Sequence, residues 1–154
     1  MLYLITILTA ICQVTLINVI AIGNIRPDLL LILVVFVAMK KGLVKAALVG
    51  ILAGFIKDIF STGAFINTLA FPVYGILVSL LKEKFYFVKE KLSVELLIVF
   101  AVSIIDSIVH IIYFSNWDYP PSVFMLVIFI AVPTVLYTSS LSVFLNLCGL
   151  KYFL

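Results

Sequence analysis

Between positions 28 and 59 the sequence reads DLLLILVVFVAMKKGLVKAALVGILAGFIKDI. Two apolar runs, 28–39 and 43–59, are separated in this stretch only by Lys40, Lys41 and Gly42. Charges, glycines and prolines divide the rest of the chain in the same way, and apolar runs of this kind are typical of membrane helices. We therefore predict an all-α, polytopic membrane protein with a six-transmembrane-helix bundle. Its runs are 2–22, 28–39, 43–59, 64–81, 94–114 and 122–148.

The run 28–39 is short for a membrane span. About twelve residues of helix extend ~18 Å, whereas the hydrocarbon core of a bilayer is ~30 Å thick. This helix would cross only if the polar residues beside it, 24–26 and 40–41, reached the two interfaces or if the bilayer thinned. Six full spans are the main prediction, and a re-entrant hairpin made of the runs 28–39 and 43–59 is the alternative.

The composition of the whole chain also indicates a membrane protein. Of its 154 residues, 66% are hydrophobic and 11% are charged, against about 45–50% and about 25% in soluble domains. A globule of this size lacks the interior to bury so much apolar surface, which excludes a secreted domain, a cytosolic enzyme, a nucleic-acid-binding domain and a disordered chain. We expect one integral membrane domain over 1–154. No Lys or Arg precedes the first run, so we interpret it as an uncleaved helix rather than a signal peptide.

The basic residues are divided unequally between the two sides of such a bundle. If the N-terminus is cytoplasmic, only Arg26 and Lys57 lie on the outer side. Because cytoplasmic loops are enriched in Lys and Arg, this bias predicts cytoplasmic N- and C-termini. In the connector 82–91 lysines alternate with aromatic residues, which suits a topology determinant, a segment on anionic lipid or a docking surface. The other basic residues are Lys40, Lys41, Lys45, Lys82, Lys84, Lys89, Lys91 and Lys151.

Small residues recur at helical spacing in the third run and reappear in the fourth. A face of small residues lets a neighbouring helix approach closely, so we expect helix packing here. Asp58 follows on the same face, and we expect it at the interface, bonded to a neighbouring segment such as 61–63. A partner contact or an ion site is the alternative role for Asp58. The expected packing residues are Ala46, Gly50, Gly54 and Gly75.

One polar stripe lies in the run 94–114. Its members, at positions i, i+3, i+4 and i+7 of one helix face, are Ser103, Asp106, Ser107 and His110. Asp106 and His110 are one turn apart and close enough to pair. Charges at bilayer depth cost about 2.5–3.5 kcal/mol each, so we expect this pair to neutralise itself and to hold helices together. A proton relay is the alternative, since histidine titrates near neutral pH.

The sequence contains no pattern of a catalytic or metal site. His110 is the only histidine, and the two cysteines, Cys12 and Cys148, lie in separate apolar runs. No nucleophile stands with a base, and neither a glycine-rich phosphate loop nor a metal-ligand spacing occurs. We therefore expect a protein that is not an enzyme, has no catalytic residue, metal or cofactor, is surrounded by membrane lipid and has no nucleic-acid partner.

Several short motifs follow one another between positions 24 and 80. They are Arg26-Pro27-Asp28 before an aliphatic run, Lys40-Lys41-Gly42, Gly50-x3-Gly54-x3-Asp58, Ser61-x-Gly63, and Asn67-Thr68-Leu69-Ala70-x3-Tyr74-Gly75. In this order and spacing they resemble the rod shape-determining protein MreD family. The chain length, the six runs and the basic inner loops also agree with that family. The second half of the chain is similar to it only in hydropathy.

The resemblance implies a multi-pass subunit of the bacterial inner membrane. Members of the family bind the bitopic protein MreC and work beside the MreB filament, the glycosyltransferase RodA and its transpeptidase. The function implied is to assemble or regulate lateral peptidoglycan synthesis in the elongation complex, and so to maintain rod cell shape. The family fold is similar to the six-helix substrate-binding subunits of energy-coupling-factor vitamin transporters.

Two other functions stay open beside this one. A vitamin-binding subunit would also be small and apolar, but it needs an outward-facing polar pocket under long loops, and the outer loops predicted here are short. A proton-coupled transporter half would use Asp106 and His110, and the low acid content of the chain counts against it.

Overall fold

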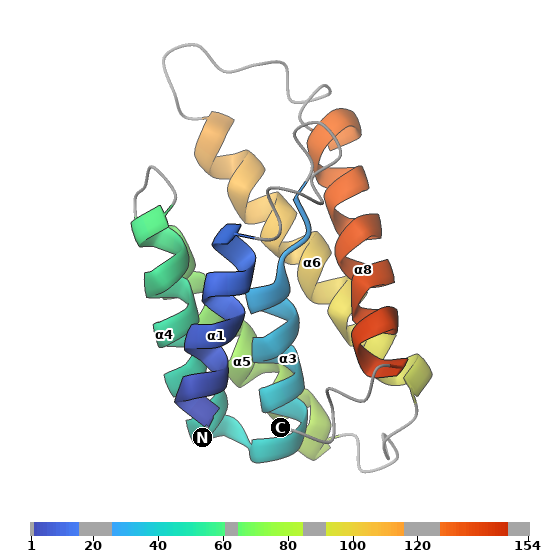
Figure 1. Ribbon diagram of the computed structural model, residues 1–154. Coiled ribbons are helices and arrows are strands. Elements are labelled where there is room, and N and C mark those ends of the chain that lie inside the picture. The colour runs from blue at the N-terminus through green and yellow to red at the C-terminus, as the bar shows by residue number, and fades with distance from the viewer. Residues whose placement is uncertain (1, 16–25, 61–64, 85–91, 116–126, 148–154) are drawn as a thin grey trace.

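The computed structural model describes residues 2–15, 26–60, 65–84, 92–115 and 127–147. These residues form six α-helices, which run in alternate directions, and one π-helical turn, with no strand among them (Figure 1). The prediction of an all-α fold is confirmed for this part of the chain. The elements are α1 (Leu2–Thr15), α3 (Leu29–Lys41), α4 (Leu43–Phe60), α5 (Ile66–Lys84), α6 (Leu92–Ser115), η1 (Val127–Ala131) and α8 (Val132–Leu147).

Two described segments are long and apolar enough to cross a membrane. They are Ser93–Tyr113 in α6 and Val127–Asn146, which covers η1 and most of α8. α5 continues to Lys84, beyond the apolar run 64–81, because Lys and Glu are good helix formers. α1 covers the first part of the run 2–22, and the rest of that run lies outside the described residues.

α3 lies at the centre of the bundle (Figure 1). It contacts α1, α4, α5, α6 and α8, and every side chain from Leu30 to Met39 is buried. A helix that is apolar on all sides has no face for water, so neighbours must surround it. Its 13 residues extend ~20 Å. The short second run therefore forms the core of the protein.

Both ends of α3 are capped by side chains. Asp28 is the N-cap and accepts a hydrogen bond from the Leu31 N–H at 3.0 Å. At the other end, the Ser79 hydroxyl of α5 donates to the Ala38 carbonyl at 3.3 Å, and Lys82 donates to the next carbonyl, that of Met39. Helix ends leave donors and acceptors without intrahelical partners, and burying them is costly. These caps allow a short helix to be buried along its whole length.

α4 and α5 interlock through glycines. A methyl group on Gly50 would lie 2.7 Å from the Pro72 Cα, and one on Gly54 would overlap the backbone of Asn67 and Thr68. In return, a methyl group on Gly75 would lie 3.0 Å from the Ala46 carbonyl oxygen. The small residues on the two helices therefore bring the two backbones into direct contact, in the manner of small-xxx-small pairs.

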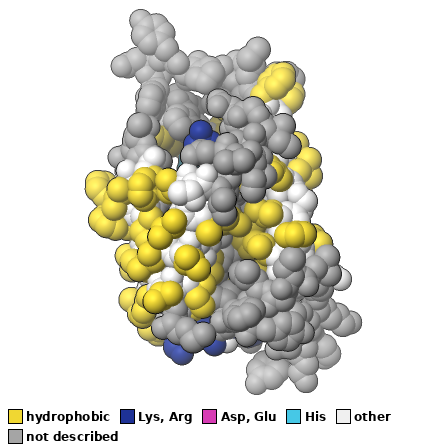
Figure 2. All heavy atoms as spheres, in the orientation of Figure 1, with side chains coloured by type: hydrophobic (Ala, Val, Ile, Leu, Met, Phe, Trp, Pro, Cys, Tyr) yellow, Lys and Arg dark blue, Asp and Glu magenta, His cyan; other side chains and the backbone are white. Residues whose placement is uncertain are grey.

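The outer surface between the two ends of the bundle is largely apolar. On the face drawn in Figure 2, hydrophobic side chains cover the middle of the molecule, and the Lys and Arg side chains lie near its two ends. Large apolar side chains are exposed on every described α-helix except α3. A contiguous apolar surface of this kind suits contact with lipid or with another protein.

Candidate functional site

A cavity of about 490 Å³ lies at the end of the bundle where α3 begins and α4 ends. Side chains from α1, α3, α4, α6, η1 and α8 contribute to its wall, together with residues just before α3. About half of the residues in the wall are apolar, and the polar half includes Arg26, Asp28, Lys57 and Asp106. Ligand pockets typically measure about 300–1,000 Å³ and combine an apolar wall with a few polar groups.

Asp28 and Lys57 form an ion pair in this wall. The Lys57 Nζ donates to Asp28 Oδ2 at 2.5 Å, while Oδ1 caps α3. The two side chains are only 20% (Lys57) and 10% (Asp28) exposed, so the pair is largely removed from water. The Lys57 ammonium also lies 4.7 Å from the centre of the Phe71 ring. Removal of either partner would leave the other charge buried without compensation.

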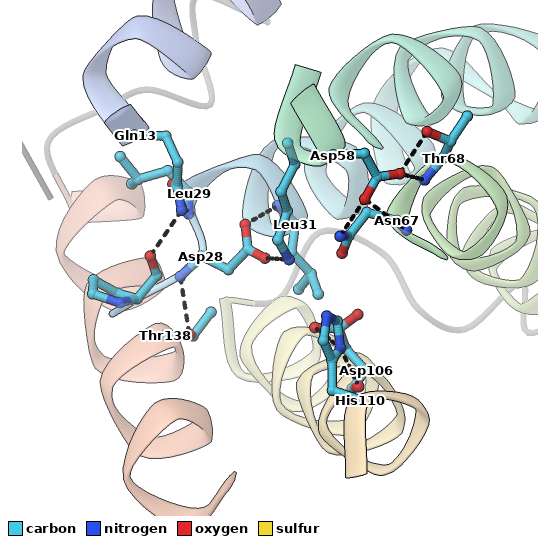
Figure 3. Close-up of polar contacts among 12 residues, drawn as sticks. Gln13, Asp28, Leu29, Leu31, Asp58, Asn67, Thr68, Asp106, His110 and Thr138 are labelled. Atoms are coloured by element: carbon cyan, nitrogen blue, oxygen red, sulfur yellow. Dashed lines mark hydrogen bonds and ion pairs between the residues drawn. The ribbon is translucent and has the colours of Figure 1, made fainter. Parts of the chain in front are cut away.

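Two helices, α1 and α8, hold the backbone that carries Asp28. The Gln13 side chain of α1 donates to the Pro27 carbonyl at 3.2 Å and accepts from the Leu29 N–H at 2.8 Å. The Asp28 N–H donates to the Thr138 hydroxyl of α8 at 3.2 Å. Figure 3 shows these contacts converging on the start of α3. The position of Asp28 in the cavity wall is therefore fixed from both sides.

Asp106 and His110 line the same cavity from α6. The His110 Nδ1 lies 3.6 Å from Asp106 Oδ2, which is too long for a hydrogen bond, and 2.9 Å from the Asp106 backbone oxygen. Asp106 Oδ1 and the hydroxyls of Ser103 and Tyr74 are buried without a hydrogen-bond partner in the described part of the chain. The stripe expected to neutralise itself thus keeps unused hydrogen-bonding capacity.

Asp58 lies apart from the cavity, between α4 and α5. Its Oδ1 accepts from the Asn67 side chain at 2.7 Å, and its Oδ2 accepts from the Thr68 N–H at 2.7 Å and the Thr68 hydroxyl at 2.6 Å. It points towards α5, away from Asp106 and His110 (Figure 3). Asp58 therefore caps the start of α5. The segment 61–63, suggested above as its partner, lies outside the described residues.

Two polar contacts were not anticipated from the sequence. The sequence places Lys57 on the outer side and indicates no partner for it, whereas in the structure it pairs with Asp28. Glu95 of α6 accepts a hydrogen bond from Asn146 of α8 at 2.5 Å, and both side chains are buried. A carboxylate near the start of an apolar run and an amide on the α8 face that carries Thr138 were the available signals for this second contact.

The described cavity groups can bind a ligand through charge and hydrogen bonds. The wall carries two cations, Arg26 and Lys57, two carboxylates, Asp28 and Asp106, and the imidazole of His110. In the part of the chain that the structure covers, no three His, Cys, Asp or Glu side chains cluster as metal ligands would. The cavity thus combines cationic, carboxylate and hydroxyl groups with apolar side chains.

No family model, curated protein or solved structure matches the chain.

The residues predicted from the sequence lie mainly in two places, the cavity and the contact between α4 and α5. Arg26, Asp28, Asp106 and His110 line the cavity. Pro27 is buried beside it and accepts from Gln13, whereas Asp58 and the packing residues Ala46, Gly50, Gly54 and Gly75 belong to the contact between α4 and α5.

Proposed function

We propose that the chain is a multi-pass protein of the bacterial inner membrane, with six spans and both termini in the cytoplasm. The apolar outer surface and the two segments of spanning length support this placement. Lys41 and Lys45 flank the turn between α3 and α4, and Lys82 reaches the same end of α3. Arg26 and Lys57 lie at the opposite end. The positive-inside rule then puts the lysine-rich end in the cytoplasm and the cavity at the outer face.

We infer further that the chain is a non-catalytic subunit of the MreD type in the elongation complex. It binds an MreC-like bitopic protein and the cell-wall synthases RodA and its transpeptidase, works beside the MreB filament, and regulates lateral peptidoglycan synthesis to maintain rod shape. The single observation that supports this function is that the motif residues of the first half contact one another. Asp58 bonds Asn67 and Thr68, and Gly54 and Gly75 lie at the α4–α5 contact.

A partner would bind this protein mainly through the helix faces that are exposed to the membrane. All described residues belong to the bundle, and their exposed large side chains are apolar over much of α4 and α5. The transmembrane helix of a bitopic protein is the kind of surface that such a face accommodates, since helices in lipid associate by close packing.

Depletion tests this function directly. In a rod-shaped host that depends on the protein, depletion should produce round cells without loss of uptake of any vitamin. A tagged copy should capture the MreC-like protein from detergent extracts, and an unrelated bitopic protein expressed at the same level should not be captured. Rod-shaped cells after depletion, or a tagged copy that captures both bitopic proteins equally, would contradict the proposal.

The cavity favours a second candidate, a substrate-binding subunit of an energy-coupling-factor vitamin transporter. Short outer loops count against such a subunit, but the helices themselves form a polar pocket. For this function, depletion should abolish uptake of one vitamin while the cells keep their shape. The tagged protein should then capture an ATPase module instead of an MreC-like partner.

A further inference from the structure

An apolar groove joins the charged cavity from the side. It measures about 380 Å³ and lies between α1 and α4. Ala10, Val14 and Ile56 line both hollows, so the two adjoin. Towards the outside, the groove is flanked by Ile7 and Ile11 of α1, which are exposed. The groove therefore connects the charged cavity to the apolar surface of the bundle, and the wall of the groove is apolar.

Three side chains of the cavity can form hydrogen bonds or ion pairs that they do not form with the described residues. Arg26 is exposed and forms no hydrogen bond or ion pair with any of them. Asp106 Oδ1 and the buried Ser103 hydroxyl have no hydrogen-bond partner among the described residues, and Asp106 Oδ2 lies 3.6 Å from His110 Nδ1. Buried polar groups in native proteins are nearly always satisfied, so Asp106 and Ser103 point to a bound donor. The exposed guanidinium of Arg26 offers a cation to an anionic group of the same ligand.

The charges define what kind of ligand would satisfy them. Asp28 and Lys57 already neutralise each other at 2.5 Å, which leaves one cation, Arg26, and one carboxylate, Asp106. A cationic ligand without an anionic group would pair with Asp106, whose side chain is 14% exposed, and would leave the exposed Arg26 to solvent. A zwitterion satisfies both.

We propose that the cavity binds the headgroup of a phosphatidylethanolamine-type lipid, with one acyl chain in the groove between α1 and α4. The phosphate faces Arg26, and the ammonium donates to Asp106 and Ser103. The groove supplies about 12 Å of apolar wall along α1 between Ile7 and Thr15. This inference rests on the proposed membrane location and is independent of the proposed role in cell shape.

Lipid selectivity of the purified full chain tests the inference. Thermal unfolding in detergent should be measured with added phosphatidylethanolamine, phosphatidylcholine, phosphatidylglycerol and free phosphoethanolamine. We expect phosphatidylethanolamine to bind about tenfold or more tightly than the other lipids, since phosphatidylcholine has no N–H donor and phosphatidylglycerol has no cation for Asp106. Free phosphoethanolamine should be weaker still, because it lacks the acyl chain.

Matched variants connect the selectivity to the cavity. Asp106→Asn and Arg26→Gln should each weaken binding of phosphatidylethanolamine about tenfold. Glu95→Gln is the control, because it also removes a buried carboxylate from α6 but lies outside the cavity wall, and it should bind like the parent. Arg26 is exposed, so its variant tests the site without disturbing the core.

Several results would overturn the inference. Equal binding of all three lipids would show a non-selective annular contact, and preference for phosphatidylglycerol would show an anion site. Equal binding of free phosphoethanolamine would show that the groove holds no chain. Cavity variants that bind like the parent would place the lipid elsewhere. Lipid selectivity in a protein whose depletion leaves cell shape intact would sustain the inference while contradicting the proposed function.

Discussion

At the scale of single residues, the Asp28–Lys57 pair joins the start of α3 to the end of α4. We expect Lys57→Met to destabilise the protein by about 2–4 kcal/mol, because it leaves the Asp28 charge in a site that is only 10% exposed. The double variant Asp28→Asn/Lys57→Met should recover part of this loss, since neither charge remains. Unfolding in detergent measures each effect, with the exposed Lys45→Met as the control. Additive losses in the double variant would contradict coupling.

The Tyr74 hydroxyl gives a second prediction at this scale. It is buried without a hydrogen bond of normal geometry to a described residue, and Asp106 is the acceptor nearest to forming one. Because Tyr74→Phe removes an unsatisfied polar group and keeps the ring, we expect a change in unfolding free energy below about 1 kcal/mol. Tyr74→Ala is the comparison, and loss of the buried ring should cost about 3–5 kcal/mol. A large loss in Tyr74→Phe would show that the hydroxyl hydrogen-bonds to Asp106 in solution.

At the scale of elements, the contact between α4 and α5 depends on the absence of side chains. Gly54→Leu would force apart backbones that already touch at Asn67 and Thr68. We expect a loss of roughly 1–3 kcal/mol, together with weaker capping of α5 by Asp58. Ala101→Leu adds one carbon less at an exposed position of α6 and should leave stability unchanged. Equal stability of both variants in detergent would contradict the packing.

At the scale of the whole molecule, the position of the turn between α3 and α4 separates six spans from a re-entrant hairpin. In a chain with Cys12 and Cys148 replaced by alanine, Lys45→Cys should react with a membrane-impermeant maleimide only when the cytoplasmic face is accessible. Arg26→Cys should react only from the outer face. The six-span model predicts this reciprocal pattern from the positive-inside rule. Labelling of Lys45→Cys from the outer face, or from neither face, would support the hairpin.

Local features of the fold were accessible from the sequence, and long-range contacts were not. The all-α class and the shared face of Ser103, Asp106 and His110 follow from apolar content and helical spacing, which are properties of neighbouring residues. The pairing of Asp28 with Lys57 joins residues of two successive runs, and no spacing rule specifies which helix faces meet. The sequence predicts a partner for Asp58 such as the segment 61–63, whereas the described contacts come from Asn67 and Thr68 on the next helix.

The sequence by itself determined that this chain is helical and strongly apolar. Composition indicates the medium around a protein, and the spacing of apolar residues indicates its secondary structure, so both can be inferred without the fold. Only the tertiary structure decided that the short helix α3 is the centre of the bundle. It also decided that Arg26, Lys57 and Asp106 line one cavity. Those outcomes depend on how six helices pack around one another, and each contact is set by the fit of faces that lie far apart in the chain.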